Sequence, residues 1–103
     1  MAIRVVRSWA GVTSSEHVAA YLAHLREETI PHLQALPGFE GIRVLRRVSE
    51  GDEYVRVQTT WQTMDSIRAF AGEDLEVAVV PPAARALLKS FDAHVEHYEV
   101  VIE

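Results

Sequence analysis

The sequence predicts an α+β fold in which one antiparallel sheet of four strands carries helices on one face. Apolar and polar residues alternate in separate segments of the chain, which is typical of half-buried strands. Elsewhere apolar residues recur at three- and four-residue steps, which is typical of amphipathic helices. With 103 residues, 49% of them hydrophobic, the chain has room for one core. We therefore expect a single domain over residues 1–103.

The first strand and helix are expected in the first third of the chain. Residues 3–11 are rich in β-branched and aromatic side chains that alternate with polar ones, so they predict a strand. Residues 13–16, Thr-Ser-Ser-Glu, have the spacing of a capping box, and a helix would run from there to about Ala35. Pro31 removes one backbone hydrogen bond, so we expect a kink or break near residues 29–30. The apolar stripe of this helix would be Val18, Leu22, Leu25, Thr29, Leu33 and Leu36.

A hairpin is expected next. Proline and glycine in residues 36–41 predict a turn, and residues 42–49 alternate as a second strand. The polar residues 50–52 form a connection of hairpin length. The third strand would cover residues 54–61. Its apolar face would be Val55, Val57, Thr59 and Trp61.

The last third should hold a short helix, a second helical segment and a strand. Thr63 can cap the short helix and Gly72 can end it. Residues 77–80 fit either strand or coil, residues 83–89 favour helix after two prolines, and residues 91–103 read as a strand. The order β-α-β-β-α-β is the split βαβ arrangement of the ferredoxin-like fold. The sheet face away from the helices also has apolar positions, and a second copy of the chain is the natural cover.

Composition narrows the possible partners. The formal net charge of −5 argues against nucleic acid, and we interpret the short run Arg43, Arg46 and Arg47 as a solvated face, with an anion site as the alternative. Without cysteine, disulfides and thiolate chemistry are excluded. The N-terminus lacks the apolar core of a signal peptide, and no apolar run has the roughly 20 residues that a bilayer requires. We expect a cytoplasmic protein that does not bind membranes.

Three stretches carry a family resemblance. They are the turn Leu-Pro-Gly-Phe-Glu-Gly at residues 36–41, Trp61 followed by residues 65–70, and the closing segment that includes His97 and Tyr98. Their spacing resembles that of the antibiotic biosynthesis monooxygenase superfamily. The resemblance implies a homodimer whose sheets pack face to face, a dimeric α/β barrel, with a ligand cavity between sheet and helices in each subunit. Members oxidise aromatic polyketides without metal or flavin, or degrade haem.

The haem-degrading branch has a residue pattern that this chain lacks. That branch uses an asparagine on the first strand, an aromatic residue (usually Trp) on the second helix and an iron-binding histidine about ten residues later. This chain has no asparagine, Phe70 stands where the tryptophan would be, and Val80 stands where the histidine would be. Because valine cannot hold iron, haem oxygenation is not expected. We expect no cofactor and no metal.

Candidate site residues follow from chemistry and from the resemblance. His97, with a side chain that titrates near neutral pH, is the candidate general base, and Trp61 is placed beside it as a catalytic residue. Both have ordinary alternatives, a half-buried histidine bonded to backbone and a core tryptophan. Flat apolar surface and the polar edge of the first helix suit an aromatic ligand. The candidate substrate-binding residues are Trp9, Tyr21, His24, Phe70 and Tyr98.

Other polar residues receive weaker interpretations. His17 shares an edge of the first helix with Tyr21 and His24, and this edge could form a cavity rim or face solvent or a partner. A strand arginine, Arg7 or Arg56, could neutralise a phenolate, although a surface position is the simpler interpretation. His32 reads as a packed residue beside the kink, His94 receives no role, and Gln58 is grouped with the two arginines.

Three functions remain open from sequence. The leading one is a cofactor-independent monooxygenase for a small aromatic or polyketide-like compound, in which a base removes a proton and the anion reduces dioxygen. The second is a non-enzymatic dimeric module that binds a small apolar ligand. The third is a cofactor-free isomerase or cyclase that uses the same pocket.

Overall fold

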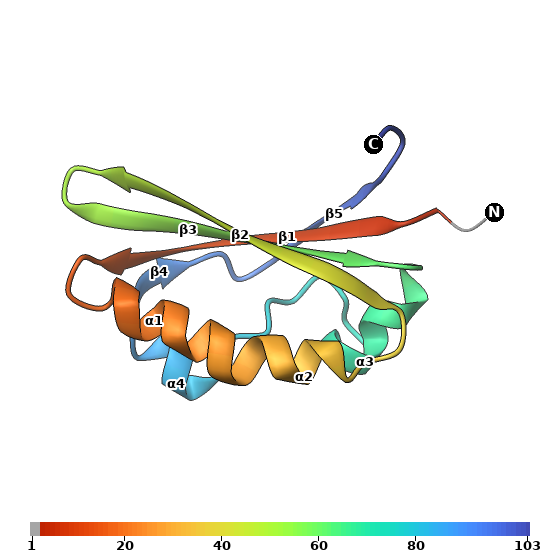
Figure 1. Ribbon diagram of the computed structural model, residues 1–103, viewed down its shortest axis with the longest axis horizontal. Coiled ribbons are helices and arrows are strands. Elements are labelled where there is room, and N and C mark those ends of the chain that lie inside the picture. Colours follow the sequence, from red (N-terminus) through yellow and green to blue (C-terminus); the bar gives the residue numbers. More distant parts are fainter. Residues whose placement is uncertain (1–2) are drawn as a thin grey trace.

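A twisted antiparallel sheet with all helices on one face forms the molecule in the computed structural model, which describes residues 3–103 (Figure 1). The strands follow the order β2-β3-β1-β4, and β5 pairs with the same edge of β1 as β4 does. None of the helices in this described part is long and apolar enough to span a bilayer. The elements are β1 (Val5–Ser14), α1 (Val18–His24), a π-helical turn (Leu25–Thr29), α2 (Ile30–Gln34), β2 (Phe39–Ser49), β3 (Asp52–Trp61), a 3₁₀ turn (Asp65–Ile67), α3 (Arg68–Ala71), α4 (Pro82–Arg85), β4 (Leu88–Phe91) and β5 (Glu96–Glu99).

The first strand is longer than predicted, and the predicted capping box is wrong. Thr13 lies inside β1 with no exposed surface, and its hydroxyl donates to the Leu87 carbonyl at 2.6 Å. It therefore cannot cap α1. The helix begins after His17, which makes no side-chain cap hydrogen bond, while the Ser14 hydroxyl accepts from the His17 N–H at 3.2 Å. Tertiary burial of the threonine wins over its local capping preference.

The first helix neither breaks nor stops at Pro31. A π-helical turn, Leu25–Thr29, joins α1 directly to α2, and Pro31 occupies the first turn of α2. A wider turn is one way for a helix to accommodate a residue that cannot donate its hydrogen bond. The helix is therefore irregular where the sequence predicts a kink or break, but the irregularity is a π-helical turn. The buried side of the helix is Val18, Tyr21, Leu25 and Leu33.

The β2–β3 hairpin closes with a two-residue turn. Glu50 and Gly51 both have positive φ, 53° and 82°, as a type I′ turn requires, and Ser49 pairs with Asp52. The register of β3 places the expected apolar set toward the helices, with Val55 and Trp61 fully buried. Both strands begin slightly earlier than predicted, at Phe39 and Asp52.

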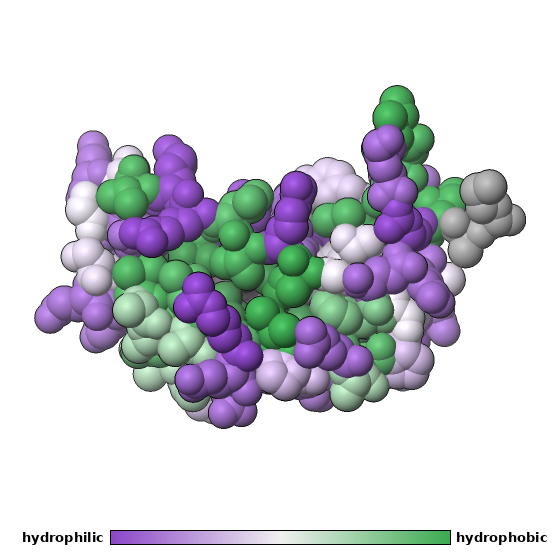
Figure 2. Space-filling view, in the orientation of Figure 1, coloured by the Kyte–Doolittle hydropathy of each residue, from purple (hydrophilic) through white to green (hydrophobic). Residues whose placement is uncertain are grey.

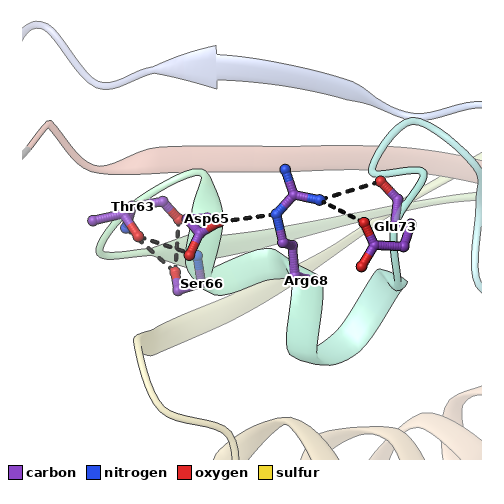
Figure 3. A network of polar contacts seen from close by, with 5 residues as sticks. All are labelled: Thr63, Asp65, Ser66, Arg68 and Glu73. Atoms are coloured by element: carbon purple, nitrogen blue, oxygen red, sulfur yellow. Dashed lines mark hydrogen bonds and ion pairs between the residues drawn. The ribbon is translucent and has the colours of Figure 1, made fainter.

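Polar contacts hold the short helix after β3 (Figure 3). The Thr63 hydroxyl accepts from the Ser66 N–H at 3.1 Å, and the Ser66 hydroxyl accepts from the Thr63 N–H at 3.3 Å, so the predicted cap is present and reciprocal. Arg68 then pairs with Asp65 at 2.8 Å and with Glu73 at 3.4 Å. Together these contacts fix where the chain turns into the segment that follows.

The fourth strand position is divided, which corrects the predicted end of the chain. The predicted helix over residues 83–89 ends at Arg85, and β4 and β5 replace one continuous strand over residues 91–103. Between them the backbone pairs elsewhere: the Val95 N–H donates to the Glu76 carbonyl, and the Ala93 carbonyl accepts from the Ala78 N–H. Because the segment over residues 76–78 takes these bonds, the pairing of β1 is interrupted between Ser8 and Gly11, where the Asp92 N–H still donates to the Ala10 carbonyl.

The sheet has one covered face and one open face. Two clusters pack between the sheet and the helices, one around Trp61 and Ile67 and one around Tyr21 and Val55. Figure 2 shows the matching band of apolar residues between the strands above and the helices below. The other face exposes large side chains, among them Leu45, Tyr54 and Tyr98.

Candidate functional site

A partly open hollow, called the chamber here, lies between the sheet and the first helix. Its volume is about 60 Å³. Side chains from β1, β3, the first helix, α3 and residues 79–81 line it, and most are apolar, as Leu33, Val57 and Val80 are. The polar exceptions are few. They are Arg7, Tyr21, His24, Thr29 and Thr59.

A wider hollow, called the vestibule here, adjoins the chamber. It has a volume of about 390 Å³ and shares five lining residues with the chamber, with Glu28 and His32 added. The chamber alone is smaller than ordinary small-ligand sites, which span roughly 300–1,000 Å³, whereas the vestibule falls in that range. A ligand would therefore place only its reacting part in the chamber. The shared residues are His24, Thr29, Phe70, Val79 and Pro81.

Arg7 brings a buried positive charge to the chamber. Only 4% of the residue is exposed, and its guanidinium donates to the carbonyls of Leu75 and Val77 and lies 5.9 Å from the Phe70 ring centre. Among residues 3–103, no carboxylate lies within ion-pair distance of it. Burial lowers the pKa of Arg7 to about 10, so the group stays protonated at neutral pH. A buried cation without a counter-ion suits an anionic ligand.

His97 contacts Arg7 rather than the chamber. It faces Arg7 across the β1–β5 pair, and its Nε2 lies 3.1 Å from an Arg7 guanidinium nitrogen. Burial lowers the pKa of His97, the positive charge of Arg7 lowers it further, and Glu76 opposes both. The neutral ring that results can accept the hydrogen bond from Arg7. His97 is not among the residues that line the chamber or the vestibule.

His24 and Tyr21 face the chamber from α1. The Nε2 of His24 is shielded from solvent and has no hydrogen-bond partner among the described residues. Tyr21 is 2% exposed, and burial raises the pKa of its phenol to about 12, so it remains protonated. His17, at the start of the same helix edge, is exposed to solvent. Of His17 and His24, only His24 lines the chamber.

The remaining candidates divide between the core and the open face. Trp9 and Phe70 line the chamber. Trp61 is fully buried and lies behind the wall, where its indole N–H donates to the Thr59 hydroxyl at 2.9 Å, and Thr59 itself lines the chamber. Tyr98 is 52% exposed on the open face.

Other sequence candidates lie away from the chamber. His32 is exposed at the vestibule, where its ring lies 6.1 Å from that of Phe70. Arg56 donates to Ser8 at 3.0 Å, and both lie on the open face. A surface hollow of about 620 Å³ on that face is lined in part by Arg56 and two residues of the arginine run, and it shares no lining residue with the chamber. No group of three or more metal-ligating side chains occurs within residues 3–103.

The sequence interpretation underestimated Arg7 and missed Thr59. Arg7 has the same strand parity as Val5 and Trp9, so the alternation that predicted β1 also placed its side chain inward. A charged residue on an apolar face was the available signal. Thr59 belonged to the predicted apolar face of β3 but was not considered as a polar group of a site.

The comparisons with known proteins agree with this architecture. The chain belongs to the antibiotic biosynthesis monooxygenase family, whose sequence profile matches residues 3–81. No curated protein matches its sequence.

Solved structures share the fold at low identity. A haem-degrading protein from Mycobacterium tuberculosis is 19% identical, with 100% of this chain and 97% of that chain covered and a TM-score of 0.62. A Bacillus cereus protein that carries the family's name is 16% identical, with 98% and 96% covered and a TM-score of 0.67. SnoaB, a cofactor-independent oxygenase from Streptomyces nogalater, is 18% identical, with 100% and 95% covered and a TM-score of 0.55. At these identities the likeness shows the α+β ferredoxin-like fold of the family and not a shared reaction.

Proposed function

We propose that this chain is a cofactor-independent monooxygenase that acts on a small aromatic or polyketide-like compound with an acidic hydroxyl or an activated methylene. The observation that carries the proposal is the buried Arg7 guanidinium, which lines an apolar chamber without a carboxylate partner among the described residues. Such a group stabilises an oxyanion strongly, because little water is present to screen it. The name of SnoaB shows that this fold hosts such chemistry in another protein.

The reaction needs only substrate and dioxygen. A proton leaves the substrate, and the anion that forms lies beside Arg7. The anion passes one electron to dioxygen, and the substrate radical and superoxide then combine to a peroxide anion. This anion takes back the proton that left the substrate and becomes a hydroperoxide. For an activated methylene, the hydroperoxide loses water to leave a carbonyl, so one oxygen atom ends in the product and the other in water. The ring of Phe70, which lines both hollows, provides a flat apolar wall for an aromatic substrate, and Trp9 lines the chamber beside the reacting part.

Two sequence candidates take supporting roles in this proposal. His97 acts through Arg7, since its neutral ring accepts a hydrogen bond from the guanidinium and so orients it. Trp61 holds the Thr59 hydroxyl at the chamber wall. Both are positioning residues here.

The open sheet face supports a homodimer as part of the proposal. Leu45, Tyr54 and Tyr98 are 44%, 38% and 52% exposed there, and a second sheet packed against them would bury all three. Tyr98 would then belong to the interface. Light scattering coupled to size-exclusion chromatography should give twice the mass of 11.6 kDa, and a monomeric mass at micromolar concentration would contradict the dimer.

Haem fits the chamber poorly. The volume of about 60 Å³ leaves no room for a porphyrin, and Val80 in its wall offers no iron ligand. A haemin titration should therefore produce no Soret shift. A stoichiometric shift would argue for the haem branch instead.

Oxygen uptake with dithranol, a hydroxylated anthrone, tests the proposal. Wild type should consume oxygen, Arg7→Lys should retain part of the rate, and Arg7→Met should lose at least tenfold in kcat/KM. Arg26→Met is the matched control, because Arg26 is exposed on the first helix and lines neither hollow. Binding of dithranol without oxygen uptake would support the ligand-binding module. Turnover that continues without oxygen would support the isomerase or cyclase.

A further inference from the structure

We infer that His24 is the general base of this site and takes the substrate proton on Nε2. The inference rests on the proposed function, which does not say which group accepts the substrate proton, and it assigns that group. Its starting point is the shielded Nε2, which has no hydrogen-bond partner among the described residues. Buried polar atoms nearly always have a partner, so an unpaired one next to a hollow points to a group that enters the hollow.

The position of His24 agrees with that role. It is one of the five residues shared by the chamber and the vestibule, and it is the only titratable one among them. A substrate that extends through both hollows must pass it. Because the chamber is small, the acidic hydroxyl of the substrate would lie at this junction and the rest of the molecule in the vestibule.

The other titratable groups that face the two hollows cannot take the proton as well. Arg7, from β1, is already protonated, and Tyr21, from α1, stays protonated because burial raises its pKa to about 12. Glu28 and His32 line only the vestibule, and both are exposed to water. Among residues 3–103, the Nε2 of His24 is therefore the one titratable proton acceptor that lies at the chamber and is shielded from solvent.

The proton transfer is simple to balance. The O–H bond of a phenol breaks, its electron pair stays on oxygen, and the proton forms the N–H bond on Nε2 of His24. The products are an imidazolium and a phenolate. The phenolate oxygen lies at the junction with the chamber, which Arg7 also lines, so the negative charge has a cation to stabilise it. An activated methylene would lose its proton to the same nitrogen.

The first experiment measures turnover of dithranol by His24→Gln. We expect kcat/KM to fall at least a hundredfold, because a positioned general base contributes about 10²–10⁴-fold. His24→Ala should regain activity when imidazole is added, which a purely structural histidine would not do. His17→Gln, on the same helix edge but outside both hollows, should stay within a few-fold of wild type.

A second measurement separates this inference from the proposed function, because it needs no oxygen. 4-Nitrophenol absorbs in the visible only as its phenolate. Wild type should bind it as the phenolate without releasing a proton to the buffer, whereas His24→Gln should bind it as the neutral phenol. If wild type takes up no oxygen but binds 4-nitrophenol as the phenolate while His24→Gln binds the neutral phenol, the oxygenase proposal fails and the inference that His24 is a base is supported. Three outcomes would contradict the role of His24 as the base. They are equal phenolate spectra in both proteins, near-wild-type turnover by His24→Gln, and no binding of 4-nitrophenol by wild type.

Discussion

Trp61 is the residue whose role is best tested by stability. It is fully buried, its ring lies 5.4 Å from Phe39 in an edge-to-face arrangement and 6.2 Å from Phe70, and its indole N–H donates to Thr59. Replacing a buried tryptophan by alanine costs roughly 3–5 kcal/mol. The total free energy of unfolding of a domain this size is only about 5–15 kcal/mol. Trp61→Ala should therefore remove about a fifth or more of the stability.

The expected shift in Tm follows from that free energy. Each kcal/mol moves the Tm of a domain of about 100 residues by roughly 4–8 °C, so Trp61→Ala should lower it by about 12 °C or more. Trp61→Phe keeps the ring packing but loses the hydrogen bond, which should cost about 1 kcal/mol. A double-mutant cycle with Thr59→Val should return about 1 kcal/mol of coupling energy. Thermal unfolding followed by circular dichroism gives the shift in Tm, and urea unfolding gives the free energies.

Activity decides whether Trp61 acts as core or as pocket wall. Measured well below the Tm, Trp61→Phe should keep dithranol oxidation or binding within a few-fold of wild type, because Trp61 lies behind the chamber wall. If Trp61→Phe unfolds like wild type within about 0.3 kcal/mol yet loses binding or turnover more than tenfold, Trp61 touches the ligand and the interpretation as a core residue is refuted.

Three further predictions concern stability. Gly38 has φ +86°, and a Cβ added there would lie 2.5 Å from the Cβ of Ser66. Gly38→Ala should therefore lower the free energy of unfolding, measured by urea titration, by about 1–3 kcal/mol. The control Gly41→Ala, at a position with open space around it, should lower it by less than half as much. Thr13→Val removes the donor to a buried carbonyl and should cost about 1–3 kcal/mol, whereas a change below 0.3 kcal/mol would show that the bond is dispensable. The pKa of His97 is lowered in the fold, so the unfolded chain binds more protons and the free energy of unfolding falls as the pH drops through about 6.5. His97→Gln should therefore weaken the dependence of this free energy on pH between pH 7 and 5. The same pH dependence in both proteins would contradict a lowered pKa of His97.

Local patterns sufficed where neighbouring residues decide the outcome. The alternation in β3 correctly placed Val55 and Trp61 toward the core, because successive side chains of a strand point to opposite faces. The cap at Thr63 and the helix end at Gly72 were correct for a similar reason, since both depend on groups a few residues away.

Local patterns failed where distant segments compete. Thr13 and Ser14 read as a helix cap, but a carbonyl in the segment after α4 lies close enough to take the Thr13 hydroxyl. Residues 87–89 favour helix by propensity, yet the free edge of β1 recruits Leu88 into β4. In both cases hydrogen bonds between segments more than 70 residues apart outweigh a preference worth at most about 1 kcal/mol per residue.

The sequence alone determined the α+β class, the element order through the hairpin, the inward face of β3 and the family to which the chain belongs. Only the tertiary structure decided which polar side chains meet. Strand pairing brings His97 to Arg7, and the packing of α1 on the sheet places His24 at the chamber with a nitrogen that no described residue satisfies. Side-chain periodicity is a property of the local backbone, whereas a buried charge and an unpaired nitrogen become meaningful only after distant segments have excluded water around them.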